Sequence, residues 1–111
     1  MISQSFRIVG PTTKLSVTDT GVTSGLIKPT SPDQTNYAAF LNTGTKPCAV
    51  TFSTTNASVA ATLPATNPGD FVLPGGMIQP VAIVVPAVPY YVGAITASGE
   101  TATLFVTPIG N

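Results

Sequence analysis

The chain has 111 residues and a mass of 11.2 kDa, a size typical of one compact domain. It carries 4 basic and 4 acidic residues, so the formal net charge is zero, and it contains no His and one Cys. Nucleic-acid binding requires a basic excess, which this composition lacks. Without His, acid–base catalysis through imidazole, Ser-His-Asp or Cys-His nucleophiles and most zinc sites are excluded. We therefore expect no enzyme activity, no catalytic residues, no metal and no cofactor.

The polar residues that replace charge are mainly Thr and Ser, and 11 Pro and 10 Gly punctuate the chain. This composition is typical of short β-strands joined by turns. A surface with little charge also has little to keep separate copies apart, which favours self-association.

At the N-terminus, residues 1–6 lack the basic start and continuous apolar stretch of a signal peptide, and residues 1–5 are expected to form a flexible arm. The uncharged stretch 71–99 is long enough to span a bilayer, but Pro74, Pro80, Pro86 and Pro89 interrupt it. Each internal proline costs about 3 kcal/mol in a helix interior. We therefore expect buried strands joined by proline corners, and no membrane partner.

Strand patterns dominate the first half of the chain, where helical periodicity is absent. The expected strands are residues 5–9, 14–18, 21–27, 36–41, 47–52 and 58–63. Between 36–41 and 47–52 lies Asn42-Thr-Gly44, whose residues tolerate a tight reversal, so the two segments are expected to form a hairpin.

The second half is expected to contain strands at 71–73, 77–85, 90–97 and 101–107, the last two paired as a hairpin. Pro80 favours a sheet edge or a bulge because proline cannot donate to the ladder. In the last segment alternate residues form two faces. One face is apolar, with Ala102, Leu104 and Val106, and the other is rich in Thr apart from Phe105.

Short strands at this spacing predict an all-β fold, a single two-sheet sandwich spanning residues 1–111. A jelly-roll topology is the first expectation and an immunoglobulin-like sandwich is the alternative, because the sequence does not set the strand order.

Few residues suggest chemistry. Cys48 begins an apolar run and is expected to be a buried free thiol. The four carboxylates are scattered in or beside turns, where we expect them to be solvated. Tyr90 and Tyr91 form an aromatic pair at a strand start, which favours packing in the core or in a protein interface.

Three segments resemble a known group of proteins: Gly69-Asp-Phe-Val-Leu73, Pro89-Tyr-Tyr-Val-Gly-Ala-Ile-Thr-Ala-Ser-Gly99 and Thr103-Leu-Phe-Val-Thr-Pro-Ile-Gly110. Together with the Asn-x-Gly ending of 36–44, they resemble the small jelly-roll capsid decoration proteins of tailed bacteriophages, which cement or staple shells. The resemblance covers residues 36–110 and brings no catalytic or ligand-binding residues with it. It implies a virion protein, made in the host cytoplasm, on the capsid exterior.

The implied partner is the major capsid protein, together with a second copy of the chain, a dimer being favoured. The residues expected to make protein contacts are Ile2, Phe6, Tyr90 and Tyr91. Three alternatives stay open: a carbohydrate- or receptor-binding domain of a tail fibre, a head–tail structural protein, and a small sandwich-fold enzyme. The tail-fibre reading needs exposed aromatic residues, of which the chain has few.

Overall fold

The computed structural model describes residues 7–28, 37–55, 59–85 and 89–110, and every regular element in these ranges is a β-strand. The strands are β1 (Arg7–Ile8), β2 (Thr13–Val17), β3 (Val22–Thr23), β4 (Tyr37–Asn42), β5 (Cys48–Ser53), β6 (Phe71–Leu73), β7 (Val81–Val84), β8 (Tyr91–Ile95) and β9 (Ala102–Gly110). Among the described residues, no helix is long and apolar enough to cross a membrane.

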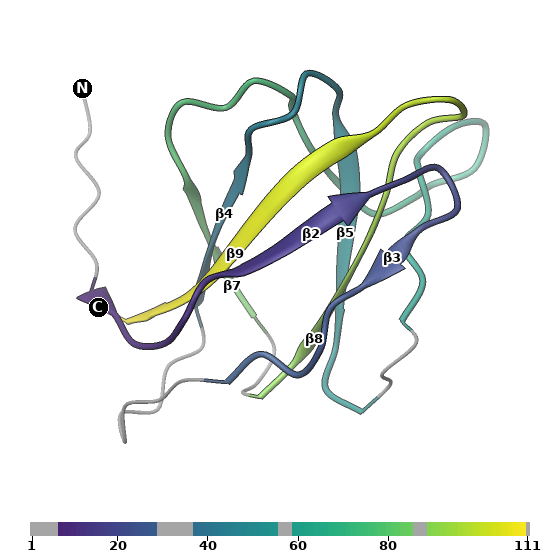
Figure 1. Cartoon of the computed structure of the whole chain (residues 1–111). Coiled ribbons are helices and arrows are strands. Elements are labelled where there is room, and N and C mark those ends of the chain that lie inside the picture. Colours follow the sequence, from purple (N-terminus) through teal and green to yellow (C-terminus); the bar gives the residue numbers. More distant parts are fainter. Residues whose placement is uncertain (1–6, 29–36, 56–58, 86–88, 111) are drawn as a thin grey trace.

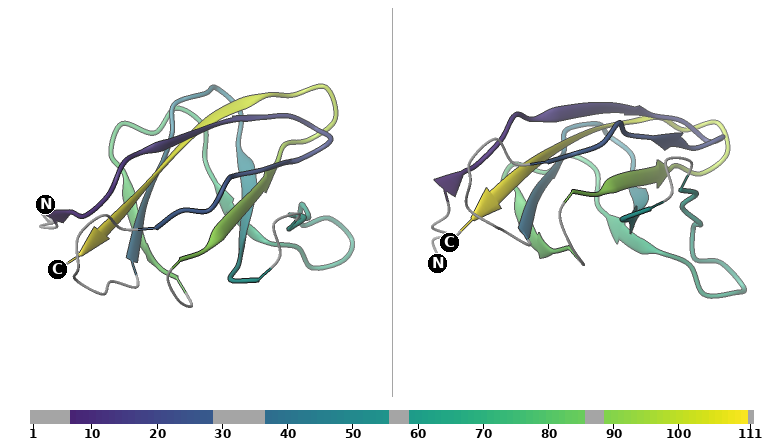
Figure 2. Two further views of the ribbon diagram at one scale, coloured as in Figure 1. Left: turned by 60° about the horizontal axis from the view of Figure 1, so that its bottom comes forward. Right: turned by 90° about the horizontal axis from the view of Figure 1, so that it is seen from below.

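The strands form two antiparallel sheets packed face to face. The five-stranded sheet has the order β1-β9-β4-β7, with β2 also paired to β9, and the four-stranded sheet has the order β3-β8-β5-β6. In Figure 1 the sheet containing β2 and β9 lies in front of β5 and β8. The view from below in Figure 2 shows the same two layers, with purple β2 and yellow β9 above green β8. The expected all-β sandwich is confirmed.

The connectivity is that of a jelly roll. From β2 onward, every connection passes from one sheet to the other except β5–β6, which stays within the four-stranded sheet. An immunoglobulin-like sandwich instead keeps several consecutive pairs, such as its first two strands, in one sheet. The strand order therefore agrees with the first of the two expected topologies.

The core lies between the sheets and is built by alternation along each strand. In β9, Leu104 and Val106 are fully buried while their neighbours are half-buried. Phe40 of β4 is also fully buried and packs against Phe52 of β5, with the two tilted rings 5.4 Å apart, centroid to centroid. These inward residues join side chains of both sheets in one cluster, because period-two alternation directs every second residue to one face.

The turn at Asn42 is held by a buried amide side chain. Its Nδ2 donates to the carbonyl oxygen of Lys46 at 2.9 Å, and its Oδ1 accepts from the amide of Gly44 at 3.1 Å. The backbone also passes close to other segments here, since a Cβ on Gly44 would lie 2.9 Å from the Cα of Ala102. The Asn-x-Gly signal thus correctly located the reversal.

The pairing predicted across this turn is wrong. β4 and β5 belong to different sheets, and so do β8 and β9. Both turns are therefore arches, which carry the chain across the core from one sheet to the other, rather than hairpins within one sheet. Each strand has an apolar inner face, and that face is buried against the opposite sheet. Gly99, at the β8–β9 arch, has φ +77°, in the left-handed region that glycine adopts freely.

The strand predicted over 58–63 is also wrong for its described part, residues 59–63, which contain no strand. Their backbone groups are paired in other ways. The Val59 carbonyl accepts from the Thr23 hydroxyl at 3.0 Å, and the Thr62 amide donates to the Asp70 carboxylate at 2.7 Å. Val59 can approach β8 because residue 93 is glycine, where a Cβ would lie 2.6 Å from the Val59 carbonyl oxygen.

The connection between β6 and β7 supplies a stability prediction. A Cβ on Gly75 would lie 2.5 Å from the backbone of Thr45, so Gly75→Ala forces two loops apart. We expect it to lower the free energy of unfolding by about 1–3 kcal/mol in urea titrations, the usual cost of overpacking. Gly25→Ala is the matched control, because nothing lies within 4 Å of its Cβ position. Equal effects of the two substitutions would contradict this packing.

Candidate functional site

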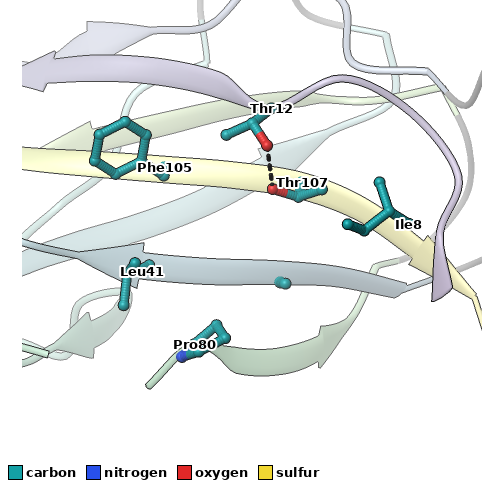
Figure 3. A pocket seen from close by; sticks show the side chains of 7 residues that line it. Ile8, Thr12, Leu41, Pro80, Phe105 and Thr107 are labelled. Atoms are coloured by element: carbon teal, nitrogen blue, oxygen red, sulfur yellow. Dashed lines mark hydrogen bonds between the residues drawn. The ribbon is translucent and has the colours of Figure 1, made fainter. Parts of the chain in front are cut away.

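The most distinctive surface is the outer face of the five-stranded sheet, where a shallow trough of about 420 Å³ is found. Figure 3 shows its side chains along β9 and β4, with Ile8 near one end and Pro80 at the lower rim. We call this surface the outer apolar face. The trough is lined by Ile8, Thr12, Ala39, Leu41, Pro80, Phe105 and Thr107.

Strand register explains the shape of the trough. Small side chains lie in one row across the strands, because Thr107 of β9 is opposite Ala39 of β4, which is opposite Ala82 of β7. Two residues further along, Phe105 is opposite Leu41, and these larger side chains form one wall. The rows run perpendicular to the strands, so the trough crosses the sheet.

On the other side of the small-residue row, the larger side chains of Tyr37 and Val84 lie opposite each other. Ile8 of β1 stands in the same row, paired to Ile109 of β9. Ile8 is 72% exposed and Val84 is 65% exposed. Exposed aliphatic side chains at both ends of the row that flanks the trough make a surface that gains free energy when a partner covers it.

The electrostatics of the face are simple. None of the seven lining residues is ionisable, and the nearest charge by register is Lys14 of β2, opposite Phe105. The hydroxyls of Thr12 and Thr107 share a hydrogen bond of 2.7 Å, drawn as the dashed line in Figure 3, so they satisfy each other. Such a site can contact a partner through shape and apolar area, without any ionisable side chain in its lining.

The outer side of the four-stranded sheet differs, because the chain itself covers part of it. There the segment around Val59 lies against Gly93, and Gly93 is buried. A second, smaller depression of about 290 Å³ lies at this place, between Thr20–Thr23, Val59–Ala61 and Ile95. The chain therefore covers part of one sheet with its own loop, whereas Ile8 and Val84 on the first sheet remain exposed.

The carboxylates of the described residues interact with groups in turns and loops. Asp19 accepts a hydrogen bond from the Gly99 amide at 2.9 Å, and Glu100 lies 3.9 Å from the Lys46 ammonium. Asp70 holds Thr62, as described above. The described residues contain no group of three His, Cys, Asp or Glu side chains that could hold a metal ion.

Of the four residues predicted to make protein contacts, the structure describes Tyr90 and Tyr91, and neither lines the outer apolar face. Ile2 and Phe6 lie outside the described residues. Tyr90 is a core residue, 0% exposed, and its ring meets Phe52 edge-on at 5.9 Å. Tyr91 is half-buried on β8, opposite Ser53, on the outer side of the four-stranded sheet. The expectation of core packing therefore applies to Tyr90, whose buried side chain cannot reach a partner in this fold.

Sequence reasoning did not single out Leu41, Pro80, Ile8 and Val84, which line or flank the trough. Two signals point to them in retrospect. Phe105 interrupts the Thr-rich face of its strand, and Tyr37–Leu41 is apolar at every position, which leaves apolar side chains on both faces of β4. A strand in a sandwich with one wet face normally alternates, so an unbroken apolar run in it marks a second dry surface.

Comparison with known proteins adds no relative: no family model, no curated protein and no solved structure matches the chain.

Cys48 is free and buried, as expected. Burial raises the pKa of its thiol from 9.0 to about 11, so at pH 8 the thiolate is about a hundredfold scarcer than in the unfolded chain. We expect alkylation of the native protein at pH 8 to be slower than that of the urea-unfolded protein by at least this factor. Equal labelling rates, followed by mass spectrometry, would show that the thiol is accessible.

Tyr90 gives a second stability prediction. Burial raises the pKa of its hydroxyl, which has no hydrogen-bond partner among the described residues. Removing a buried, unpaired hydroxyl removes a desolvation cost, so Tyr90→Phe should raise the free energy of unfolding by about 1 kcal/mol. Tyr91→Phe, at a half-buried site, is the control and should change it little. A marked loss of stability in Tyr90→Phe would mean that the hydroxyl is paired.

Proposed function

We propose that this protein is a structural virion component that binds the outside of a phage capsid and cements or staples neighbouring major-capsid subunits. The observation that carries the proposal is the outer apolar face, an uncharged trough with exposed aliphatic flanks on a small domain that offers no catalytic group there. Jelly rolls are common among viral capsid proteins and lectins, which is an analogy of fold and supports the proposal only as such. The resemblance of residues 36–110 to capsid decoration proteins points the same way.

A small, weakly charged domain is physically suited to cementing a shell. A cement protein adds buried area across the seams of a shell, and the effect is multiplied over many copies, so each contact can be weak. The trough accepts apolar side chains of a shell subunit, while its flanks add area around them. Because the lining carries no charge, attraction comes from apolar burial rather than from ion pairs.

The test uses shells of the phage that encodes the chain, stripped of this protein. Purified protein should co-sediment with them, and raising the salt concentration should weaken binding little because few charges take part. Decorated shells should also survive heating or osmotic shock better than stripped shells of the same geometry. Failure to bind, or binding only at low salt, would overturn the proposal.

Phe105→Thr tests the face itself. It removes the aromatic wall of the trough and leaves a residue that strands accept, so the fold should persist while shell affinity falls at least about tenfold, or about 1.4 kcal/mol. The matched control is Tyr91→Thr, which removes a half-buried aromatic side chain from the opposite outer surface. If the control loses binding and Phe105→Thr keeps it, the shell contacts the other sheet. Circular dichroism of both variants verifies the fold.

A further inference from the structure

A second surface is the free edge of the five-stranded sheet. β7 is the terminal strand of that sheet, paired with β4 on one side only among the described residues. Its four residues alternate between half-buried and exposed, and none is buried, whereas β4 has four buried residues of six. A terminal strand leaves backbone N–H and C=O groups along one edge that can pair with another chain.

Natural sheets protect such edges with charged side chains, prolines or very short strands. The opposite side of the same sheet has this protection, because Lys14, the second residue of β2, is exposed. At the edge of the four-stranded sheet, β6 has only three residues and follows Asp70. β7 carries no charge, and no charge occurs anywhere from 71 to 99. Its blocking residues lie outside the strand, since Pro80 stands just before it and Pro86 follows in the sequence.

We propose that β7 pairs antiparallel with β7 of a second copy, joining two five-stranded sheets into one. An antiparallel pair related by a two-fold axis needs a strand that matches its own reverse. With the axis at Ile83, Ile83 opposes itself and Ala82 opposes Val84 of the second copy. All these pairs are apolar, so two identical copies meet without like charges. A register centred on Ala82 would instead place Pro80 within the ladder, where it cannot donate.

The position of the axis has a consequence for the outer apolar face. A two-fold axis that relates antiparallel neighbours is perpendicular to the sheet, so the outer faces of both copies lie on the same side. Ala82 belongs to the small-residue row and Val84 to the large-residue row beside it, so their pairing across the axis leads the small-residue row of each copy onto the large-residue row of the other. Two troughs on the same side of the joined sheet could then hold two shell subunits at once; this use, unlike the pairing itself, rests on the proposed function.

The size of the contact sets the conditions of the test. A ladder of one short strand from each copy buries less than the roughly 1,200 Å² of a standard stable interface, so we expect a weak dimer in free solution. The measurement is sedimentation equilibrium of the purified full chain, up to high micromolar concentration and without shells. A second copy is the expected occupant. If the protein stays monomeric throughout, the edge serves another partner or none, and the proposal is overturned even if the protein binds shells.

A first pair of variants locates the contact. Ala82→Lys puts a charge on the edge and should raise the dimer dissociation constant at least tenfold. Ser16→Lys, at an exposed site on β2 of the same sheet, should leave it unchanged. If Ala82→Lys dimerises like the native chain, β7 is not the interface. Circular dichroism spectra check that both variants fold.

Cysteine crosslinking tests the register. Under mild oxidation, Ile83→Cys should form an intermolecular disulfide, because directly opposed residues bring their Cβ atoms to about 4.5–5.5 Å, close to the roughly 3.5–4.5 Å of a disulfide. Ala82→Cys should not, because the two copies of residue 82 are then diagonal neighbours, roughly 7–8 Å apart. The native chain is the background, since its own thiol is buried. Crosslinking of Ala82→Cys but not Ile83→Cys, or of neither, would overturn the proposed pairing.

Discussion

The fold depends on the pairing of β9 with strands on both of its sides. Its nine residues pair with β1 and β2 along one side and with β4 along the other. Because the pleat alternates, one set of β9 residues builds the core and the other builds the outer apolar face. Leu104 and Val106 are in the first set, and Phe105 and Thr107 are in the second. A slip of one residue in this register would exchange the two surfaces and expose the core. The core and the candidate binding surface are thus set by one strand.

The sequence predicted this strand well because its alternation is strong and local. It also located the turns at Asn42 and Gly99 and the thiol of Cys48, since each depends on the chemistry of a few neighbouring residues. The pairing across those turns could not be read from the sequence. A short turn suits a hairpin and an arch equally, and the choice between them depends on which sheet can cover the inner face of each strand.

The outer apolar face was harder to predict for a related reason. Leu41, Phe105 and Pro80 are distant in sequence, and only the register of three strands brings them together. Tyr90 shows the opposite error, because an aromatic residue at a strand start is equally suited to the core and to a surface. The segment at Val59 was misread as a strand because its apolar residues satisfy their backbone groups through Thr23 and Asp70 rather than through a ladder.

The loop between Thr62 and Asp70 is closed at its base by two hydrogen bonds of 2.7 Å, one from each backbone amide. Residues 64–69 beyond this clamp are exposed and belong to the side of the four-stranded sheet, away from the outer apolar face (Figure 2). A loop fastened at its base and solvated at its tip tolerates inserted sequence, since lengthening it adds little closure entropy. A foreign peptide inserted at Thr66 would be carried by a domain whose core and outer apolar face are left intact. That makes this loop a suitable position for displaying epitopes or enzymes.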